Sequence, residues 1–228
     1  MLKITYLVMV YNEIKTVKKA IEDVININYK NKEILVIDNG SVDGSQDVIK
    51  SFKNIKKILR KKNLGVGKTI EEGIAKAKGD YIFTQFSDLE YDHKKSIYMM
   101  EYAIKKKLDV VFGSRLKKKT SLMLEIKKRP AVLATIICTF LINKFYKKKF
   151  TDIIGVKLYK KDSIKKIPIN CYKAGFEFES VSRMCKRNLR IKEVFVKYSP
   201  RKNSKDKKIK FYHMFDAIFQ IFKVKIFG

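Results

Sequence analysis

The chain has 228 residues, of which 46% are hydrophobic, and its 52 basic and 23 acidic residues give it a formal net charge of +29 at pH 7. This size and apolar content exclude a disordered chain, because a chain of this length buries roughly 70% of its unfolded surface in one large domain or two small ones. A collagen-like or low-complexity chain is excluded by the low content of glycine (10) and proline (3).

The first half of the chain predicts strands that alternate with helices. Short apolar runs mark the strands, and apolar residues at helical spacing mark the segments between them. The expected strands cover residues 4–10, 33–37, 56–59, 80–86 and 109–113, and the expected helices cover 17–25, 44–52, 67–77 and 93–106. Continuously apolar strands that alternate with helices indicate a mostly parallel sheet covered on both faces. We therefore expect a doubly wound α/β fold.

The alternation stops after Arg115. A long helix is expected over residues 120–147, and strands are expected over 153–159 and 191–198. Residues 199–208 are polar, and an amphipathic helix follows. We expect one face of this helix to carry Phe211, Phe215, Ile218 and Phe222, and the other to carry Lys210, His213, Asp216, Gln220 and Lys223. Such a helix packs on the body of the protein or lies in a membrane interface.

The charge is unevenly distributed along the chain. Residues 1–114 carry 21 basic and 15 acidic residues, a net of +6, whereas residues 115–228 carry 31 and 8, a net of +23. The second half is therefore expected to face phosphate, in nucleic acid or in lipid headgroups. An AT-rich coding bias is the alternative cause, because 45 of the 52 basic residues are lysine, but it does not explain the scarcity of acids after residue 114. With 7 arginines and no nucleic-acid-binding motif, we expect no nucleic-acid partner.

The three cysteines, Cys138, Cys171 and Cys185, are far apart and form no CxxC pattern. This disfavours a disulfide framework and a zinc site, so we expect a cytoplasmic protein. The N-terminal residues alternate like a strand and show no leader, so we do not expect a secreted precursor. The nearly uncharged run 131–142 reaches about 18 Å as a helix, too short for a hydrocarbon core of roughly 30 Å. Any membrane association is therefore expected to be peripheral.

Four carboxylates follow predicted strands, where parallel sheets bind their ligands. They are Glu13, Asp38, Asp88 and Glu90. Asp88 and Glu90 are separated by one residue, so in an extended chain both point to one side and could share a hard divalent cation with a diphosphate. Each carboxylate alone could equally be a solvated loop group or a helix cap. Spacing alone indicates only a nucleotide-binding α/β protein.

Eight segments of the chain follow one another in the order and spacing that is typical of one protein family. They are VMVYNE (8–13), VIDNGSVDGS (36–45), NLGVGKTIEEGIAKAKGDYI (63–82), QFSDLEYD (85–92), FGSR (112–115), TDIIGVKLYKK (151–161), GFEFE (175–179) and EVFVKYSPRKNSKDKKI (193–209). On these segments the chain resembles glycosyltransferase family 2, and most of all its polyprenyl-phosphate (dolichyl-phosphate) mannosyl- and glucosyltransferase branch. The resemblance covers about residues 3–216.

This resemblance implies a GT-A-like nucleotide-sugar fold and transfer of a hexose, with inversion, from a nucleotide diphosphate to a lipid phosphate. It implies a catalytic domain over residues 1–198, with a nucleotide-sugar half (1–114) and an acceptor half (115–198). Residues 199–228 then form a basic loop and an amphipathic, membrane-interfacial helix. The implied partners are a nucleotide-diphosphate sugar, a polyprenyl phosphate and an anionic membrane surface, and the implied location is the cytoplasmic membrane face.

The resemblance also implies roles for individual residues. On the donor side, it implies that Tyr11, Glu13 and Asp38 hold the nucleoside and that Lys68 and Asp88 lie near the diphosphate. It implies that Asp88 and Glu90 bind Mg²⁺ or Mn²⁺. On the acceptor side, it implies that Arg115, Arg201 and Lys207 contact the phosphate and that Asp152 and Glu179 line the sugar side. The chain departs from the family pattern at three positions. Phe86 replaces the first acid of the metal motif, Asn39 stands where a second aspartate is common, and Asp206 stands where a glycine often precedes the paired lysines.

The acceptor decides between two mechanisms. A sugar hydroxyl is neutral at pH 7 and needs a base, whereas a phosphate monoester is already anionic and needs none. Transfer to a lipid phosphate therefore requires basic residues that hold two anions together. Transfer to a glycan hydroxyl, the alternative within the family, would use Glu177 or Glu179 as the base. A catalytically silent sugar-nucleotide binder is a further alternative because of Phe86.

Overall fold

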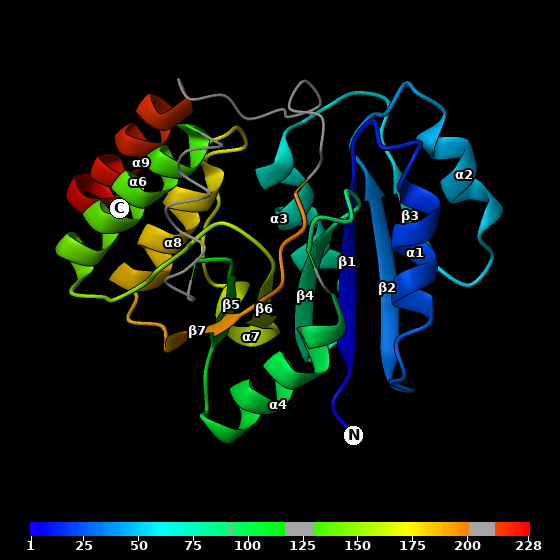
Figure 1. Ribbon diagram of the computed structural model, residues 1–228, viewed down its shortest axis with the longest axis horizontal. Coiled ribbons are helices and arrows are strands. Elements are labelled where there is room, and N and C mark those ends of the chain that lie inside the picture. Colours follow the sequence, from blue (N-terminus) through cyan, green and yellow to red (C-terminus); the bar gives the residue numbers. More distant parts are fainter. Residues whose placement is uncertain (92, 117–129, 201–212) are drawn as a thin grey trace.

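The computed structural model describes residues 1–91, 93–116, 130–200 and 213–228 (Figure 1). The strands are β1 (Ile4–Val10), β2 (Lys32–Asp38), β3 (Lys56–Leu59), β4 (Tyr81–Phe86), β5 (Val110–Ser114), β6 (Lys157–Lys160) and β7 (Ile191–Phe195). The helices are α1 (Val17–Ile25), α2 (Ser45–Ser51), α3 (Val66–Lys76), the 3-10 turn η1 (His93–Lys95), α4 (Ser96–Lys105), α6 (Pro130–Tyr146), α7 (Lys161–Ile164), α8 (Phe176–Lys186) and α9 (His213–Phe227).

The described strands form one seven-stranded sheet in the order β3-β2-β1-β4-β6-β5-β7. All neighbouring strands are parallel except β6, which runs antiparallel to both β4 and β5. The carboxyl ends of β1, β2 and β4 therefore lie at one edge of the sheet, the upper edge in Figure 1. This edge is where an open parallel sheet binds its ligands.

Alternate residues along each strand belong to two different hydrophobic layers. On β1, Leu7 and Met9 join a layer packed against α3, α6, α8 and α9, whereas Tyr6 and Val8 join the layer packed against α1 and α4. Both faces of β1 are buried, which explains why its sequence is apolar at every position but Thr5 rather than alternating. The expected mostly parallel, doubly wound sheet is confirmed.

The second half of the chain differs from its expected elements. The strand expected over 153–159 begins only at Lys157, because Gly155 has a φ of +138° that an extended strand does not accommodate, and it runs antiparallel. The strand expected over 191–198 ends at Phe195. Helix α6 begins at Pro130, and residues 120–129 of the expected helix 120–147 lie outside the described residues. Helices α7 and α8 were not expected.

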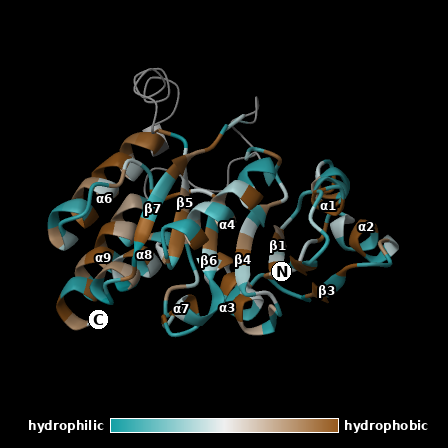
Figure 2. Ribbon diagram, turned by 90° about the horizontal axis from the view of Figure 1, so that it is seen from below, coloured by the Kyte–Doolittle hydropathy of each residue, from teal (hydrophilic) through white to brown (hydrophobic). Residues whose placement is uncertain are grey.

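Helix α9 packs on the body of the protein with one apolar side and exposes a second apolar side to solvent. Its inner side is formed by Ala217, Ile221 and Val224, which are buried. Of the apolar face expected from the sequence, Ile218 packs against the core, but Phe215 and Phe222 are exposed. The expected two-sided division is therefore wrong, because the helix has two apolar stripes. Figure 2 shows the hydrophobic colouring of both α6 and α9.

No helix among the described residues combines the length and the hydrophobicity needed to cross a membrane. The division of the chain at residue 198 stays a prediction.

Candidate active site

The loop that follows β1 is tied to the loop that follows β2. The backbone N–H of Asn12 donates to Ser41 Oγ at 2.8 Å, and its side-chain oxygen accepts from the Val42 N–H at 2.9 Å. The Glu13 N–H donates to Ser45 Oγ at 3.0 Å. Tyr11 and Glu13, both half-buried, therefore sit on a loop held in place at the carboxyl edge of the sheet. This position agrees with a nucleoside site, and their role stays a prediction.

Asp38, expected to hold a nucleoside, organises the β2 loop instead of facing outward. Its side chain is completely buried. It accepts hydrogen bonds from the N–H groups of Gly40 and Ser41 at 3.0 and 2.8 Å, from Ser41 Oγ at 2.5 Å, and from Gln46 Nε2 at 2.7 Å. A carboxylate with four donors shapes the loop around it. In this arrangement Asp38 acts on a ligand through the loop that it holds.

Asn39 stands where the family often has a second aspartate, and its amide explains the substitution. Its nitrogen donates to Asn63 Oδ1 at 2.8 Å, while its oxygen accepts from Arg60 Nη1 at 2.7 Å and from the Leu64 N–H at 3.1 Å. A carboxylate could accept the second and third of these bonds but could not donate the first. Asn39 thus joins the β2 and β3 loops.

The start of α3 lies close to the segment before α8. Gly65 has a φ of +89°, and a Cβ there would come within 2.0 Å of the Tyr172 carbonyl oxygen, so only glycine fits. In the first turn of α3, Lys68 forms an ion pair with Glu71 and lies 5.2 Å from the centroid of the Tyr172 ring. The hydrogen bond to Glu71 raises the Lys68 pKa, so its ammonium stays charged. Lys68 is at the edge where a diphosphate is expected.

The metal motif forms a turn rather than the extended chain expected from the sequence. Residues 87–89 turn directly after β4, and Leu89 adopts the left-handed conformation with a φ of +59°. The Asp88 Oδ1 atom accepts a hydrogen bond from the Glu90 N–H at 3.1 Å. The two residues thus lie in one turn rather than in an extended chain, which corrects the alternation argument and keeps them in one loop. Phe86, in place of the first acid, packs against the core layer that contains α3 and α8.

Tyr198 connects this loop to the second half of the chain. Its hydroxyl donates to Glu90 Oε2 at 2.7 Å, and the Ser199 N–H donates to the Glu90 carbonyl at 2.8 Å. Its ring lies 5.0 Å from that of Tyr91, centroid to centroid. Sequence reasoning missed Tyr198, although it lies inside the EVFVKYSPRK segment. The available signal was an aromatic residue directly before a basic loop.

Arg115 and Asp152 form one buried ion pair, although they were expected on different sides of the acceptor. Arg115 Nε lies 2.7 Å from Asp152 Oδ2 and Nη2 lies 3.0 Å from Oδ1, a two-point contact. Asp152 is completely buried, and the guanidinium also lies 5.2 Å from the centroid of the Tyr198 ring. Burial would lower the Arg115 pKa, but Asp152 and its neighbours hold it well above the usual value. The pair fixes the guanidinium beside Tyr198, and Asp152 balances its charge.

The two glutamates considered as bases for a hydroxyl acceptor both form ion pairs with basic side chains. Glu177 Oε2 lies 2.5 Å from Lys157 Nζ, whose side chain is 1% exposed. Glu179 is buried, and it accepts from the Asn170 and Cys171 N–H groups and from Arg183 Nε at 2.9 Å. Its placement is structural, which departs from the expectation that it lines the sugar side. Lys157 was not singled out from the sequence, where it resembles any other lysine.

Some expected residues cannot be placed. Arg201, Asp206 and Lys207 lie outside the described residues. Within the described part of the chain, no group of three or more His, Cys, Asp or Glu side chains gathers as a metal site. Asp88 and Glu90 are therefore considered as a pair.

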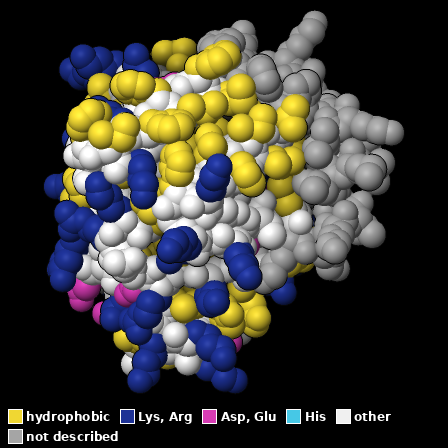
Figure 3. All heavy atoms as spheres, turned by 90° about the vertical axis from the view of Figure 1, so that its left-hand side faces the viewer, with side chains coloured by type: hydrophobic (Ala, Val, Ile, Leu, Met, Phe, Trp, Pro, Cys, Tyr) yellow, Lys and Arg dark blue, Asp and Glu magenta, His cyan; other side chains and the backbone are white. Residues whose placement is uncertain are grey.

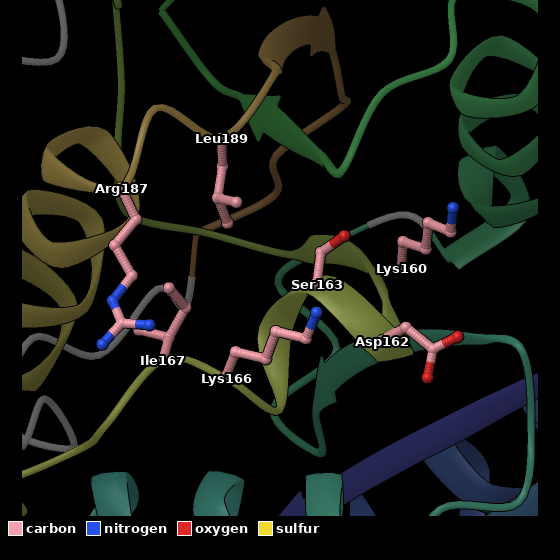
Figure 4. A pocket seen from close by; sticks show the side chains of 7 residues that line it. All are labelled: Lys160, Asp162, Ser163, Lys166, Ile167, Arg187 and Leu189. Atoms are coloured by element: carbon pink, nitrogen blue, oxygen red, sulfur yellow. The ribbon is translucent and has the colours of Figure 1, made fainter.

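A cavity of about 560 Å³ lies at the opposite edge of the sheet (Figure 4). It is lined by Lys160, Asp162, Ser163, Lys166, Ile167, Arg187 and Leu189. Lys160 pairs with Tyr81, the first residue of β4, so the cavity lies at the amino edge of the parallel strands. This position separates it from the loops that carry the expected site.

Comparison with known proteins identifies the family of this fold and its loops. Residues 5–168 match the model of glycosyl transferase family 2. The chain belongs to this family. It is a glycosyltransferase by this assignment, and the branch within the family is not decided by the match.

Two characterised relatives share parts of the sequence. The poly-beta-1,6-N-acetyl-D-glucosamine synthase of Staphylococcus epidermidis is 31% identical over 129 residues, 54% of this chain and 31% of the relative. The cholesterol galactosyltransferase of Borreliella burgdorferi is 32% identical over 83 residues, 35% of this chain and 23% of the relative. The matches thus span about a third or less of these relatives.

The same fold occurs in a solved structure. Glucosyl-3-phosphoglycerate synthase from Mycobacterium tuberculosis, in complex with Mn²⁺, uridine diphosphate and phosphoglyceric acid, superimposes with a TM-score of 0.73 at 14% identity. The match covers 100% of this chain and 80% of that one. The GT-A-like architecture of the family 2 glycosyltransferase described here is therefore confirmed.

Proposed function

We propose that this glycosyltransferase moves a hexose, with inversion, from a nucleotide-diphosphate sugar to a polyprenyl phosphate. It acts at the cytoplasmic face of the membrane, with which it associates peripherally. Within the family, this acceptor class needs basic residues that bind its phosphate and needs no general base.

The observation that carries the proposal is the pairing of the candidate bases. Glu177 is paired with Lys157, Glu179 with Arg183, and Asp152, which was expected beside Glu179 on the sugar side, with Arg115. To take a proton from a substrate hydroxyl, each of these carboxylates would first have to leave the cation that it contacts. A hydroxyl acceptor needs a base, whereas a phosphate acceptor brings its own anionic nucleophile. The arrangement therefore favours the phosphate.

The donor side agrees with a nucleotide-diphosphate sugar. The structural relative with the same fold binds uridine diphosphate and Mn²⁺. In this chain Asp88 and Glu90 lie in one turn, and their carboxylate oxygens are the ligands that Mg²⁺ or Mn²⁺ prefers, so the pair fits such a cation. When bound there, the cation neutralises the diphosphate that leaves.

The remaining residues hold the substrates in place. Tyr11 and Glu13 sit on the β1 loop and Asp38 fixes the β2 loop, so the two loops form the nucleoside side. Lys68, in the first turn of α3, adds positive charge near the leaving diphosphate. Arg115, Arg201 and Lys207 attract the acceptor phosphate, which agrees with the net +23 of residues 115–228. Catalysis in this scheme is mainly the positioning of two anions.

A second candidate is transfer to a hydroxyl. The names of the two sequence relatives favour it, because one makes a poly-N-acetylglucosamine and the other galactosylates a sterol. In this case Glu177 or Glu179 would have to leave its cation and accept the proton of the hydroxyl.

Four single variants separate the two candidates. With polyprenyl phosphate as acceptor, Arg201→Ala and Lys207→Ala should raise the acceptor KM or lower kcat while donor binding survives, and Lys18→Ala, on the exposed surface of α1, serves as the matched control. Glu177→Gln and Glu179→Gln, checked for folding, should be comparatively mild. If either Gln variant is nearly inactive while folded, and Arg201→Ala resembles the parent chain, the proposal is wrong.

A further inference from the structure

Among the described residues, exposed large hydrophobic side chains gather on two neighbouring helices. Helices α6 and α9 pack against each other. The ring centroids of Phe145 and Phe222 lie 5.1 Å apart, and Lys225 Nζ donates to the Phe145 carbonyl at 3.3 Å. Side chains on their outer side form a surface that we call the outer α6–α9 face. It consists of Leu133, Phe140, Phe215, Phe219, Phe222 and Ile226.

This face is too large to be scattered surface hydrophobicity. Phe140, Phe215 and Phe219 are 62%, 67% and 61% exposed. Since a phenylalanine presents about 150 to 250 Å² of surface, these three alone expose on the order of 400 Å². Patches of this size usually mark a protein or membrane contact. Figure 3 shows hydrophobic side chains gathered over the upper part of this side of the molecule, with lysines and arginines among and below them.

The charges around the face point to one kind of partner. Lys144, Lys223 and Lys225 on the same two helices are exposed. Asp216 is the only acid in α6 and α9, and it is half-buried and accepts a hydrogen bond from the Gly175 N–H at 2.8 Å. An apolar stripe flanked by lysines fits the boundary between the acyl chains and the headgroups of an anionic lipid layer. A second copy would bring the lysines of both faces together, because a two-fold interface pairs the same patch on each subunit.

We propose that the outer α6–α9 face docks on an anionic membrane, with its phenylalanines at the level of the acyl chains and its lysines at the headgroups. This inference rests on the proposed function, because it assumes an acceptor that resides in the membrane. It names the surface that brings the site to that acceptor. Helix α9 thus packs on the protein with one apolar stripe and meets the lipid with the other.

The absence of tryptophan from the chain gives a direct test. A single reporter, Phe219→Trp in the full chain, should shift its emission to the blue with vesicles of phosphatidylglycerol and phosphatidylcholine, and much less with phosphatidylcholine alone. The matched reporter Tyr98→Trp, on α4 and 49% exposed, should not shift. No shift for Phe219→Trp, or equal shifts for both reporters, would overturn the proposal.

Co-sedimentation with the same vesicles measures the contribution of the face. Phe215→Ser combined with Phe219→Ser should weaken binding on the order of 10-fold or more, because two aromatic rings no longer move from water into the acyl-chain region. Ile104→Ser, an exposed apolar position on α4, is the matched control and should bind like the parent chain. Added salt should release the parent chain only in part, since the lysine contribution is screened and the apolar one is not. Equal binding of the double variant and the parent would overturn the proposal.

Two further measurements separate this inference from its alternatives. Light scattering without vesicles should show the same mass for the parent chain and the double variant, and a dimer that the double variant loses would assign the face to a second copy instead. Transfer to polyprenyl phosphate in detergent should survive in the double variant. A parent chain that catalyses this transfer but does not bind vesicles would overturn the docking and the peripheral association, and would leave the proposed reaction and acceptor intact.

Discussion

Lys157 places its ammonium nitrogen 2.5 Å from the Glu177 carboxylate, and its side chain is only 1% exposed. The same nitrogen donates to the Gly155 carbonyl at 3.2 Å and lies 5.5 Å from the centroid of the Phe112 ring. A buried lysine is thus neutralised by one of the two glutamates, Glu177 and Glu179, considered as the base for a hydroxyl acceptor.

The first prediction concerns the stability of this pair. Glu177→Gln should lower the free energy of unfolding by about 3 to 5 kcal/mol, because it leaves a buried charge without its counter-charge. Urea unfolding measures the loss. Lys157→Met combined with Glu177→Leu should recover most of it, since no charge then remains buried. A Glu177→Gln chain as stable as the parent would show that the carboxylate does not neutralise Lys157.

The second prediction concerns Tyr198 and Glu90. Tyr198→Phe removes the 2.7 Å hydrogen bond to the carboxylate and should cost about 1 kcal/mol of stability. It should also weaken Mn²⁺ binding several-fold, because outer partners orient metal ligands. Titration with Mn²⁺ measures this directly. Tyr102→Phe, on α4, is the control and should leave Mn²⁺ affinity unchanged. Loss of stability with no change in Mn²⁺ affinity would leave Tyr198 a purely structural residue.

The third prediction concerns Asp88. Asp88→Asn should lower the transfer rate on the order of 100-fold or more, because the leaving diphosphate loses its counter-charge. Steady-state kinetics with Mn²⁺ measures the effect, and Asp47→Asn, on the exposed surface of α2, is the control. Full turnover that Mn²⁺ still stimulates in Asp88→Asn would exclude this site. Phe86→Asp should destabilise the protein, because Phe86 packs against the core.

The fourth prediction concerns pH and Glu33, whose carboxylate is buried at the start of β2. Burial would raise its pKa, but hydrogen bonds from Lys56, Thr5 and the Lys78 N–H hold the pKa below the ordinary 4.5. The native carboxyl therefore binds a proton more weakly than the unfolded one, so its contribution to stability is present above about pH 4.5 and is lost as the pH falls through the folded pKa. Urea unfolding of Glu33→Gln should show a loss at pH 7 that shrinks in acid. A loss independent of pH would contradict this assignment.

The first half of the fold could be predicted from the sequence because its signals are local. The strand from Ile4 to Val10 is buried at every position and apolar at all but Thr5, and polar turns follow it. The antiparallel β6 could not be predicted, because its direction depends on pairing with Tyr81 and Val110, which are distant in the chain. The faces of α9 were misjudged for a similar reason, since only packing against α8 and α6 decides which of two apolar stripes turns inward.

The site could be predicted as a set of loops but not as a set of contacts. Asp88 and Glu90 follow β4 as expected, yet the left-handed conformation of Leu89 between them leaves no clear mark in the sequence. The pairing of Arg115 with Asp152 joins residues 37 positions apart. A sequence shows which charges exist, whereas the fold determines which of them neutralise each other.

The most direct measurement is a comparison of two acceptors that differ in one group. Polyprenyl phosphate and polyprenol of the same chain length, each incubated with a panel of radiolabelled nucleotide sugars and Mn²⁺, offer the enzyme a phosphate or a hydroxyl on the same lipid. We expect labelled glycolipid from polyprenyl phosphate with one donor, no product from polyprenol, and a rate that shows no general-base limb near neutral pH. Transfer to polyprenol or to a glycan hydroxyl, with none to polyprenyl phosphate, would contradict the proposed acceptor.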